Sequence, residues 1–188
     1  MNRVKEEILE RVEAICGKST PESDDLDFIW SLCESRDPEL RLRAAEALGI
    51  IPSCDKNIEL LKRLAADRDE LVCAEAMDSI AVKGDFSCLD VLKRGADSDS
   101  SMIRGYSCSS SAELCRRTGQ AGDSTVNWLK SLLFTEEDEW VKTNIYGGLA
   151  LLGRKEYLEV LRERLESEDF YIQSTAGSLL ELIGEYDA

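Results

Sequence analysis

A single stretch, residues 37–49 (DPELRLRAAEALG), carries the hydrophobic pattern of one complete helix. Asp37 suits the N-cap, because its carboxylate can accept hydrogen bonds from backbone N–H groups two and three residues on. Pro38 suits the first helical position, where a missing N–H costs nothing. Gly49 or Pro52 is expected to end the helix. The apolar positions recur at three- and four-residue spacing and predict one buried face, formed by Leu40, Ala44, Ala47, Leu48 and Ile51.

The pattern returns four times, at intervals of 31 to 38 residues. Each later copy again opens on a residue that favours the N-cap: Asp69, Ser100, Asp138 and Asp169. Such a period, with two helical patterns in each copy, is typical of a solenoid. The sequence therefore predicts an all-α fold, a right-handed α-α superhelix of about five helical pairs behind an N-terminal capping helix. We expect a single repeat domain over residues 1–188, with the capping helix at 1–17 and repeats at 24–52, 55–83, 85–118, 123–153 and 154–184.

The repeated motif resembles the second helix of a HEAT repeat, of the short bacterial kind also found in bilin-lyase-like proteins. The matching residues are Asp37, Pro38, Leu40, Arg41, Ala44, Ala45, Ala47, Leu48 and Gly49. Later copies match in part, since Cys73 and Gln173 stand where the motif has arginine. The resemblance covers about residues 24–183 and implies a HEAT-like solenoid. It says little about function, because this superfamily serves many functions.

The net charge limits the classes of molecule that the protein is expected to bind. The net charge of −15 and a pI near 4.5 argue against nucleic acid and anionic membranes, both of which attract basic surfaces. They favour a basic protein partner or simply serve solubility. Residues 1–16 are charged and helical in pattern, unlike a signal peptide, and no apolar run approaches the length of a membrane span. We therefore expect a cytoplasmic protein that is monomeric when free.

Catalytic chemistry has little support in the sequence. The chain contains no histidine that could serve as a base for a serine or cysteine nucleophile, and its carboxylates are spread along solvated helix faces. With no C-x-x-C motif, a zinc site is not expected, and we predict no metal and no cofactor. The seven cysteines are expected to be reduced, with five buried among apolar residues: Cys16, Cys33, Cys73, Cys88 and Cys108.

Residues 98–111 (SDSSMIRGYSCSSS) depart from the pattern, because serine and glycine are poor residues for a helix interior. Two interpretations stay open. The backbone and hydroxyl groups of this segment could approach a partner. Alternatively, its small residues could allow tight packing between neighbouring helices.

The HEAT resemblance implies that the second helix of each pair lines the concave surface. Positions two, six and nine residues after each N-cap lie on one helical stripe there. The stripe is acidic in the N-terminal repeats and aromatic in the C-terminal ones. We expect a protein partner to be anchored by Leu71, Met102, Tyr106, Trp140 and Tyr171, and its basic groups to be bound by Glu46, Glu75 and Asp78. The alternative for Trp140 and Tyr171 is packing within their own repeat.

These features together predict a non-catalytic protein-binding module. One concrete form is an inhibitor or immunity protein that masks a basic protein such as a nuclease toxin, because charge complementarity speeds association with a cationic site. Two alternatives stay open: a bilin-lyase-like protein that handles a chromophore, and a general regulatory adaptor.

Overall fold

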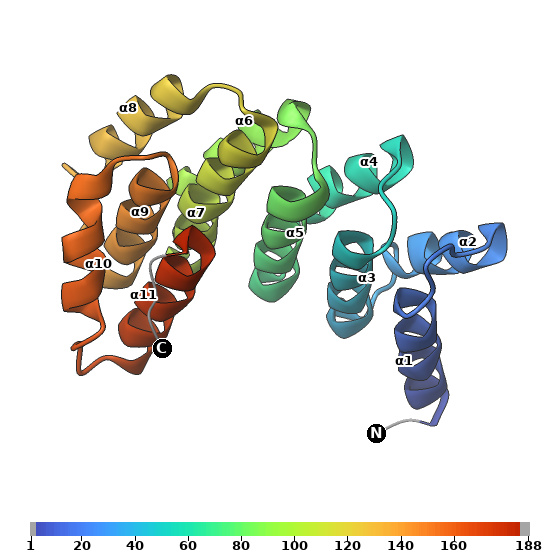
Figure 1. Ribbon diagram of the computed structural model, residues 1–188. Helices are drawn as coiled ribbons and strands as arrows, with labels where there is room; N and C mark the ends of the chain where they lie inside the picture. Colours follow the sequence, from blue (N-terminus) through green and yellow to red (C-terminus); the bar gives the residue numbers. More distant parts are fainter. Residues whose placement is uncertain (1–2, 185–188) are drawn as a thin grey trace. The chain divides into compact units, whose positions relative to one another are not determined.

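The structure is a computed structural model that describes residues 3–184, and every regular element in this range is helical (Figure 1). Helix α1 spans Arg3–Cys16. Five pairs follow: α2 (Ser23–Leu32) with α3 (Pro38–Ile50), α4 (Asp55–Leu64) with α5 (Glu70–Lys83), α6 (Leu89–Arg94) with α7 (Ser101–Thr118), α8 (Gly122–Leu132) with α9 (Glu139–Leu151), and α10 (Leu158–Arg164) with α11 (Phe170–Ile183). Short 3-10 turns occur at Phe86–Cys88, Gly95–Asp97 and Lys155–Tyr157. The predicted all-α repeat architecture is confirmed, whereas the superhelix and its hand stay a prediction.

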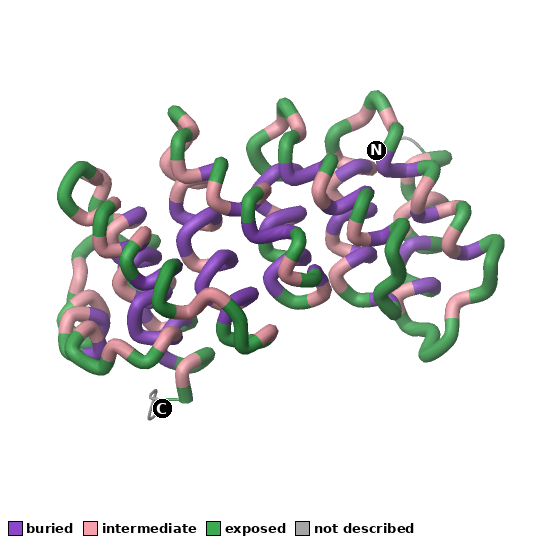
Figure 2. Tube along the Cα trace, turned by 90° about the horizontal axis from the view of Figure 1, so that it is seen from above, coloured by how far each residue is buried: buried purple, intermediate pink, exposed green. Residues whose placement is uncertain are grey.

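The chain divides into two compact units, with the boundary between Cys88 and Leu89. Unit 1 contains α1 to α5, and unit 2 contains α6 to α11. Within unit 1, α3 packs against α1, α2, α4 and α5. Within unit 2, α9 packs against both α7 and α11. Figure 2 shows the buried positions concentrated along the helices, with the exposed positions gathered at the turns.

All five predicted N-caps of the second helices are confirmed. Asp37 Oδ1 accepts from the N–H of Glu39 at 3.0 Å, and Ser100 Oγ accepts from that of Ile103. The three remaining caps, Asp69, Asp138 and Asp169, each accept two N–H groups from the first turn of their helix. Each cap satisfies backbone donors that have no partner within the helix.

The turn before each second helix repeats a further hydrogen bond. The side chain two residues before the cap accepts from the backbone N–H of the cap itself, at 2.9 to 3.2 Å, in all five repeats. These acceptor side chains are Ser35, Asp67, Ser98, Glu136 and Ser167. The chain thus uses either serine or an acid for one structural task.

The two acidic acceptors also bind an arginine from the preceding repeat. Arg41 in α3 makes two bonds of 2.7 Å to the carboxylate of Asp67, with both side chains close to fully buried. Arg104 in α7 forms the equivalent pair with Glu136, at 2.8 and 3.0 Å. Both guanidinium groups also donate to two carbonyl oxygens in the turn before their own helix. Each unit therefore contains one bidentate pair that joins consecutive repeats.

Of the two expected helix ends, Gly49 is not the one used: α3 continues through Ile50, and its C-cap Ile51 directly precedes Pro52. The role of Gly49 is close packing of α3 against α5. A Cβ at residue 49 would overlap the side chain of Ser79, whose Oγ donates to the carbonyl of Ala45 at 2.9 Å. The missing side chain lets the two helices approach.

The structure supports the tight-packing interpretation of the serine-rich segment. Helix α7 runs unbroken for 18 residues. Ser107 is buried and its Oγ donates to the carbonyl of Leu92 at 2.7 Å. A Cβ at Gly105 would overlap the ring of Trp140. Small residues here make room for α6 on one side and α9 on the other.

The cysteines are free thiols. Cys33, Cys73, Cys88 and Cys108 are buried as predicted, whereas Cys16 is only half-buried. Burial raises the pKa of Cys33 and Cys73 to about 11 and that of Cys108 to about 12. These three side chains stay protonated at neutral pH and act as small apolar core residues.

Candidate functional site

Three of the predicted site residues form an acidic patch in unit 1, which we define as Glu46, Glu75 and Asp78. Glu46 lies on α3, and the other two lie one turn apart on α5, which packs against α3. Their side chains are half-buried or exposed. The acids are close enough for Asp78 and Glu46 to raise the pKa of Glu75. The structure therefore brings together the three carboxylates that the sequence assigns to one stripe.

The surroundings of the acidic patch disfavour ionisation of two of its carboxylates, those of Glu75 and Asp78. Burial is the largest cause of the raised pKa of Glu75, and the like charges of Asp78 and Glu46 add to it. Asp78 keeps contact with solvent, yet the surrounding chain removes enough of its hydration to raise its pKa also. Arg43 offsets part of this charge, because it pairs with Glu46 at 2.7 Å and lowers the pKa of Glu75. A cation from outside would relieve the remaining repulsion.

Neutralising Glu75 is expected to stabilise the protein. The raised pKa means that the fold resists ionisation of this group more than the unfolded chain does. The carboxylate is therefore destabilising at pH 7, and this penalty disappears as the pH falls below the ordinary value of 4.5. We expect Glu75→Gln to raise the free energy of unfolding by up to about 0.5 kcal/mol at pH 7, the scale of exposed charge effects. Urea unfolding at pH 7 and pH 4 measures both values; a gain at pH 4 as large as that at pH 7 would contradict this cause.

The aromatic surface of unit 2 comprises Met102 and Tyr106 on α7, Trp140 on α9 and Tyr171 on α11. The first three are half-buried. The rings of Tyr106 and Trp140 lie 6.1 Å apart and inclined at 54°. The indole N–H of Trp140 donates to Thr175 Oγ1 at 2.8 Å, and its ring lies over Gly105. Trp140 therefore joins three helices, which leaves less of it available to a partner.

Leu71 and Tyr171 are the most exposed of the predicted anchors. These residues are 56% and 73% accessible, and each lies two residues after its N-cap, on α5 and α11 respectively. The neighbouring Phe170 is 71% accessible and meets the Tyr171 ring edge-on at 6.0 Å. Exposed aromatic side chains of this size are typical of binding surfaces, because they bury a large area at little entropic cost.

The sequence reasoning overlooked another set of exposed apolar residues. Ile50, Val82 and Leu182 stand 13 residues after the caps of α3, α5 and α11, and each is 50 to 52% accessible. Ile50 also lines a small cavity between α1 and α3, together with Cys16 and Glu13. The shared offset of these three residues was visible in the repeats and is the signal that could have identified them.

These surfaces offer charged and apolar groups that a partner could contact. Carboxylates with raised pKa values attract cations, and exposed aliphatic and aromatic side chains attract apolar groups. Within residues 3–184, no three histidine, cysteine or acidic side chains group as ligands for a metal ion. In the same range, no helix has the length and apolar character needed to cross a membrane.

Comparisons with known proteins add no function. No protein-family model matches the chain, and no curated protein matches it significantly. Among solved structures, the crystal structure of an engineered protein is similar over 96% of this chain and 90% of its own, with 23% identical residues and a TM-score of 0.47. We therefore infer the function from the geometry of the two surfaces.

Proposed function

We propose that this chain is a non-catalytic, HEAT-like module that binds a basic protein through the second helices of its repeats. The acidic patch of unit 1 contacts basic side chains of the partner. Leu71, Tyr171 and the exposed part of the aromatic surface contact its apolar groups. One form of this function is an inhibitor that covers the cationic site of an enzyme such as a nuclease.

The observation that carries the proposal is the gathering of Glu46, Glu75 and Asp78 on one surface. Repulsion among neighbouring carboxylates lowers the stability of the fold. Such destabilising groups of charges are common at functional sites. A cationic partner removes the penalty on binding. The same charges accelerate encounter with a basic protein, so association should slow as salt rises.

A paired-variant capture experiment tests the proposal. The tagged protein is incubated with lysate of its host at low and high salt, and retained proteins are identified by mass spectrometry. The patch variant carries Glu75→Gln and Asp78→Asn and leaves Glu46 intact, because Glu46 is ion-paired with Arg43. The control variant carries Glu59→Gln and Glu163→Gln, which remove the same charge from exposed positions on α4 and α10.

The expected result is a basic protein that the wild type and the control variant retain at low salt. The patch variant should retain at least tenfold less of it. Tyr171→Ala should also weaken retention without unfolding the protein, because this side chain is exposed. Equal retention by the patch and control variants would contradict the proposal. Retention of a tetrapyrrole or a pigment protein in place of a basic protein would support the chromophore-handling alternative.

A further inference from the structure

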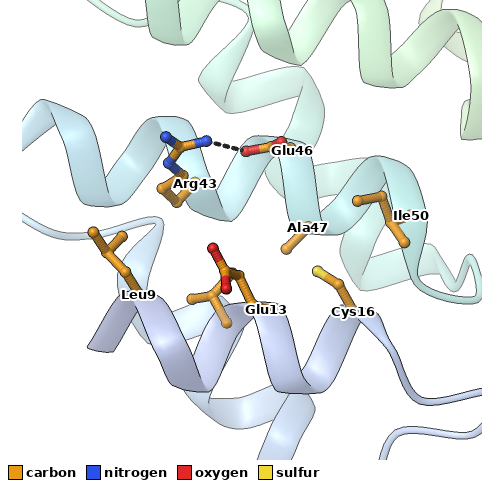
Figure 3. A pocket seen from close by; sticks show the side chains of 8 residues that line it. Leu9, Glu13, Cys16, Arg43, Glu46, Ala47 and Ile50 are labelled. Carbon is orange, nitrogen blue, oxygen red and sulfur yellow. Dashed lines mark hydrogen bonds and ion pairs between the residues drawn. The ribbon is translucent and has the colours of Figure 1, made fainter. Parts of the chain in front are cut away.

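A cavity of about 150 Å³ lies between α1 and α3 in unit 1 (Figure 3). At roughly 30 Å³ for each water molecule, it has room for about five waters, or for a short unbranched chain. Beyond the cavity towards the start of α1, Lys5 forms an ion pair with Asp37 at 2.7 Å. Buried Val12 and Ile15 fix α1 against the core. The cavity therefore lies between α1 and α3, is partly open to solvent, and has one wall, α1, held in place by this ion pair and these buried side chains.

The lining of the cavity combines two chemistries. Its walls are aliphatic, and its polar groups include two carboxylates, one from each helix. Figure 3 shows the Glu13 side chain between the two helices and the Glu46 carboxylate turned to Arg43, with which it is paired. The aliphatic lining consists of Leu9, Val12, Ala47 and Ile50, and the polar lining of Glu13, Cys16, Arg43 and Glu46.

The charge of the cavity is negative, although it contains one cation. Arg43 is paired with Glu46 at 2.7 Å. Glu13 forms no salt bridge within residues 3–184 and also acts on Arg43 and Cys16 through space. Both carboxylates raise the pKa of the Cys16 thiol, although burial is the larger cause. A second cation near Glu13 would balance this charge.

We propose that this cavity receives a lysine or arginine side chain of the basic partner. The inference rests on the proposed function and names one point of contact. The aliphatic stem of such a side chain would lie against the Leu9 and Ile50 walls, and its charged end would reach Glu13 and the Glu46 oxygen that Arg43 does not bind. A purely apolar side chain leaves the charge of Glu13 unbalanced, and an anion is repelled by both carboxylates.

The half-buried Cys16 thiol reports occupancy of the cavity. The experiment uses the full chain with Cys54→Ser, because Cys54 is the exposed cysteine that would otherwise react. Methyl methanethiosulfonate, a neutral reagent, labels Cys16, and mass spectrometry follows the rate. The same chain with Cys16→Ser gives the background from the buried cysteines. The probe is butylammonium, which has the chain and charge of lysine; 1-butanol is its uncharged match, and sodium chloride keeps the ionic strength constant.

Butylammonium at 50 mM is expected to slow the labelling of Cys16 at least threefold, whereas 1-butanol should slow it less than 1.5-fold. Glu13→Gln should abolish the protection. Glu10→Gln removes the same charge from an exposed position on the same helix, outside the cavity, and should preserve the protection. Equal protection by the alcohol, no protection by the amine, or equal loss in both variants would overturn the proposal.

Failure of this inference can be distinguished from failure of the proposed function. The capture experiment alters Glu75 and Asp78, neither of which lines the cavity. A basic protein lost only by the patch variant, together with an unprotected Cys16, would leave the function standing and remove the cavity from the interface.

Discussion

Replacing Arg41 with alanine should lower the free energy of unfolding by about 3 kcal/mol, since removal of one partner leaves a buried charge uncompensated. Burial alone would raise the pKa of Asp67, yet the hydrogen bonds from Arg41 and from the backbone of Asp69 outweigh it and hold that pKa below its usual range. The pair therefore stabilises the fold above pH 3.8, and its contribution is lost as the pH falls through the lowered pKa. Urea unfolding at pH 7 measures the loss.

The control for this variant is Arg43→Ala, two residues along the same helix. Arg43 also has an acidic partner, but both members of that pair are about 45% exposed. Such pairs contribute roughly 0 to 1 kcal/mol. Similar losses in the two variants would contradict the special role of the buried pair. In a double-mutant cycle, adding Asp67→Ala to Arg41→Ala should cost much less than Asp67→Ala costs alone.

A single methyl group at Gly105 should also destabilise the protein strongly. In an ordinary helix interior, Gly→Ala stabilises by roughly 0.5 to 1 kcal/mol. Here the new Cβ would overlap the six-membered ring of Trp140, which is itself fixed by its hydrogen bond to Thr175. We expect Gly105→Ala to lower the free energy of unfolding by about 2 kcal/mol, within the range of overpacked cores. Thermal and urea unfolding both measure this loss of stability, which is opposite in sign to the usual effect of Gly→Ala.

Two further variants separate overlap from helix propensity. Gly122→Ala adds the same methyl group to α8, where nothing lies within 4 Å of the new atom, and should be near neutral. The double variant Gly105→Ala with Trp140→Leu should lose less stability than the two single losses combined, because a smaller side chain relieves the overlap. Stabilisation by Gly105→Ala alone would show that the ring moves aside freely.

The start of each second helix could be predicted from the sequence, because the signals that set it are local. Asp37 and Pro38 act on residues within one turn, so the start of α3 follows from its own segment. The caps of the other second helices follow in the same way. The acidic patch was also predictable, because equivalent offsets in consecutive copies fall on one stripe, as the proximity of Glu46 and Glu75 bears out.

Contacts between residues far apart in the chain could not be predicted from the sequence. Gly49 looked like a helix stop because glycine commonly has that role, and only the position of Ser79 reveals the need for close approach. The Arg41–Asp67 pair spans 26 residues and depends on how one repeat stacks on the next. The cavity at Cys16 is lined by residues of both α1 and α3 and depends on how these two helices pack. The close approach at Gly49, the ion pair and the cavity each depend on two segments of the chain, so no single segment predicts any of them.

The acceptor position two residues before each N-cap, which holds either serine or an acid, also restricts how repeats can be exchanged. Its acid occurs in the repeat that follows an arginine, as in Arg41 with Asp67 and Arg104 with Glu136. Serine occurs where the preceding copy carries Cys73 or Lys142 instead. Moving the Asp67 repeat behind a copy without arginine would bury a carboxylate with no countercharge. The order of these neighbouring copies is thus encoded in matched side chains, and removing or exchanging a repeat that holds one member of either pair would break that pair.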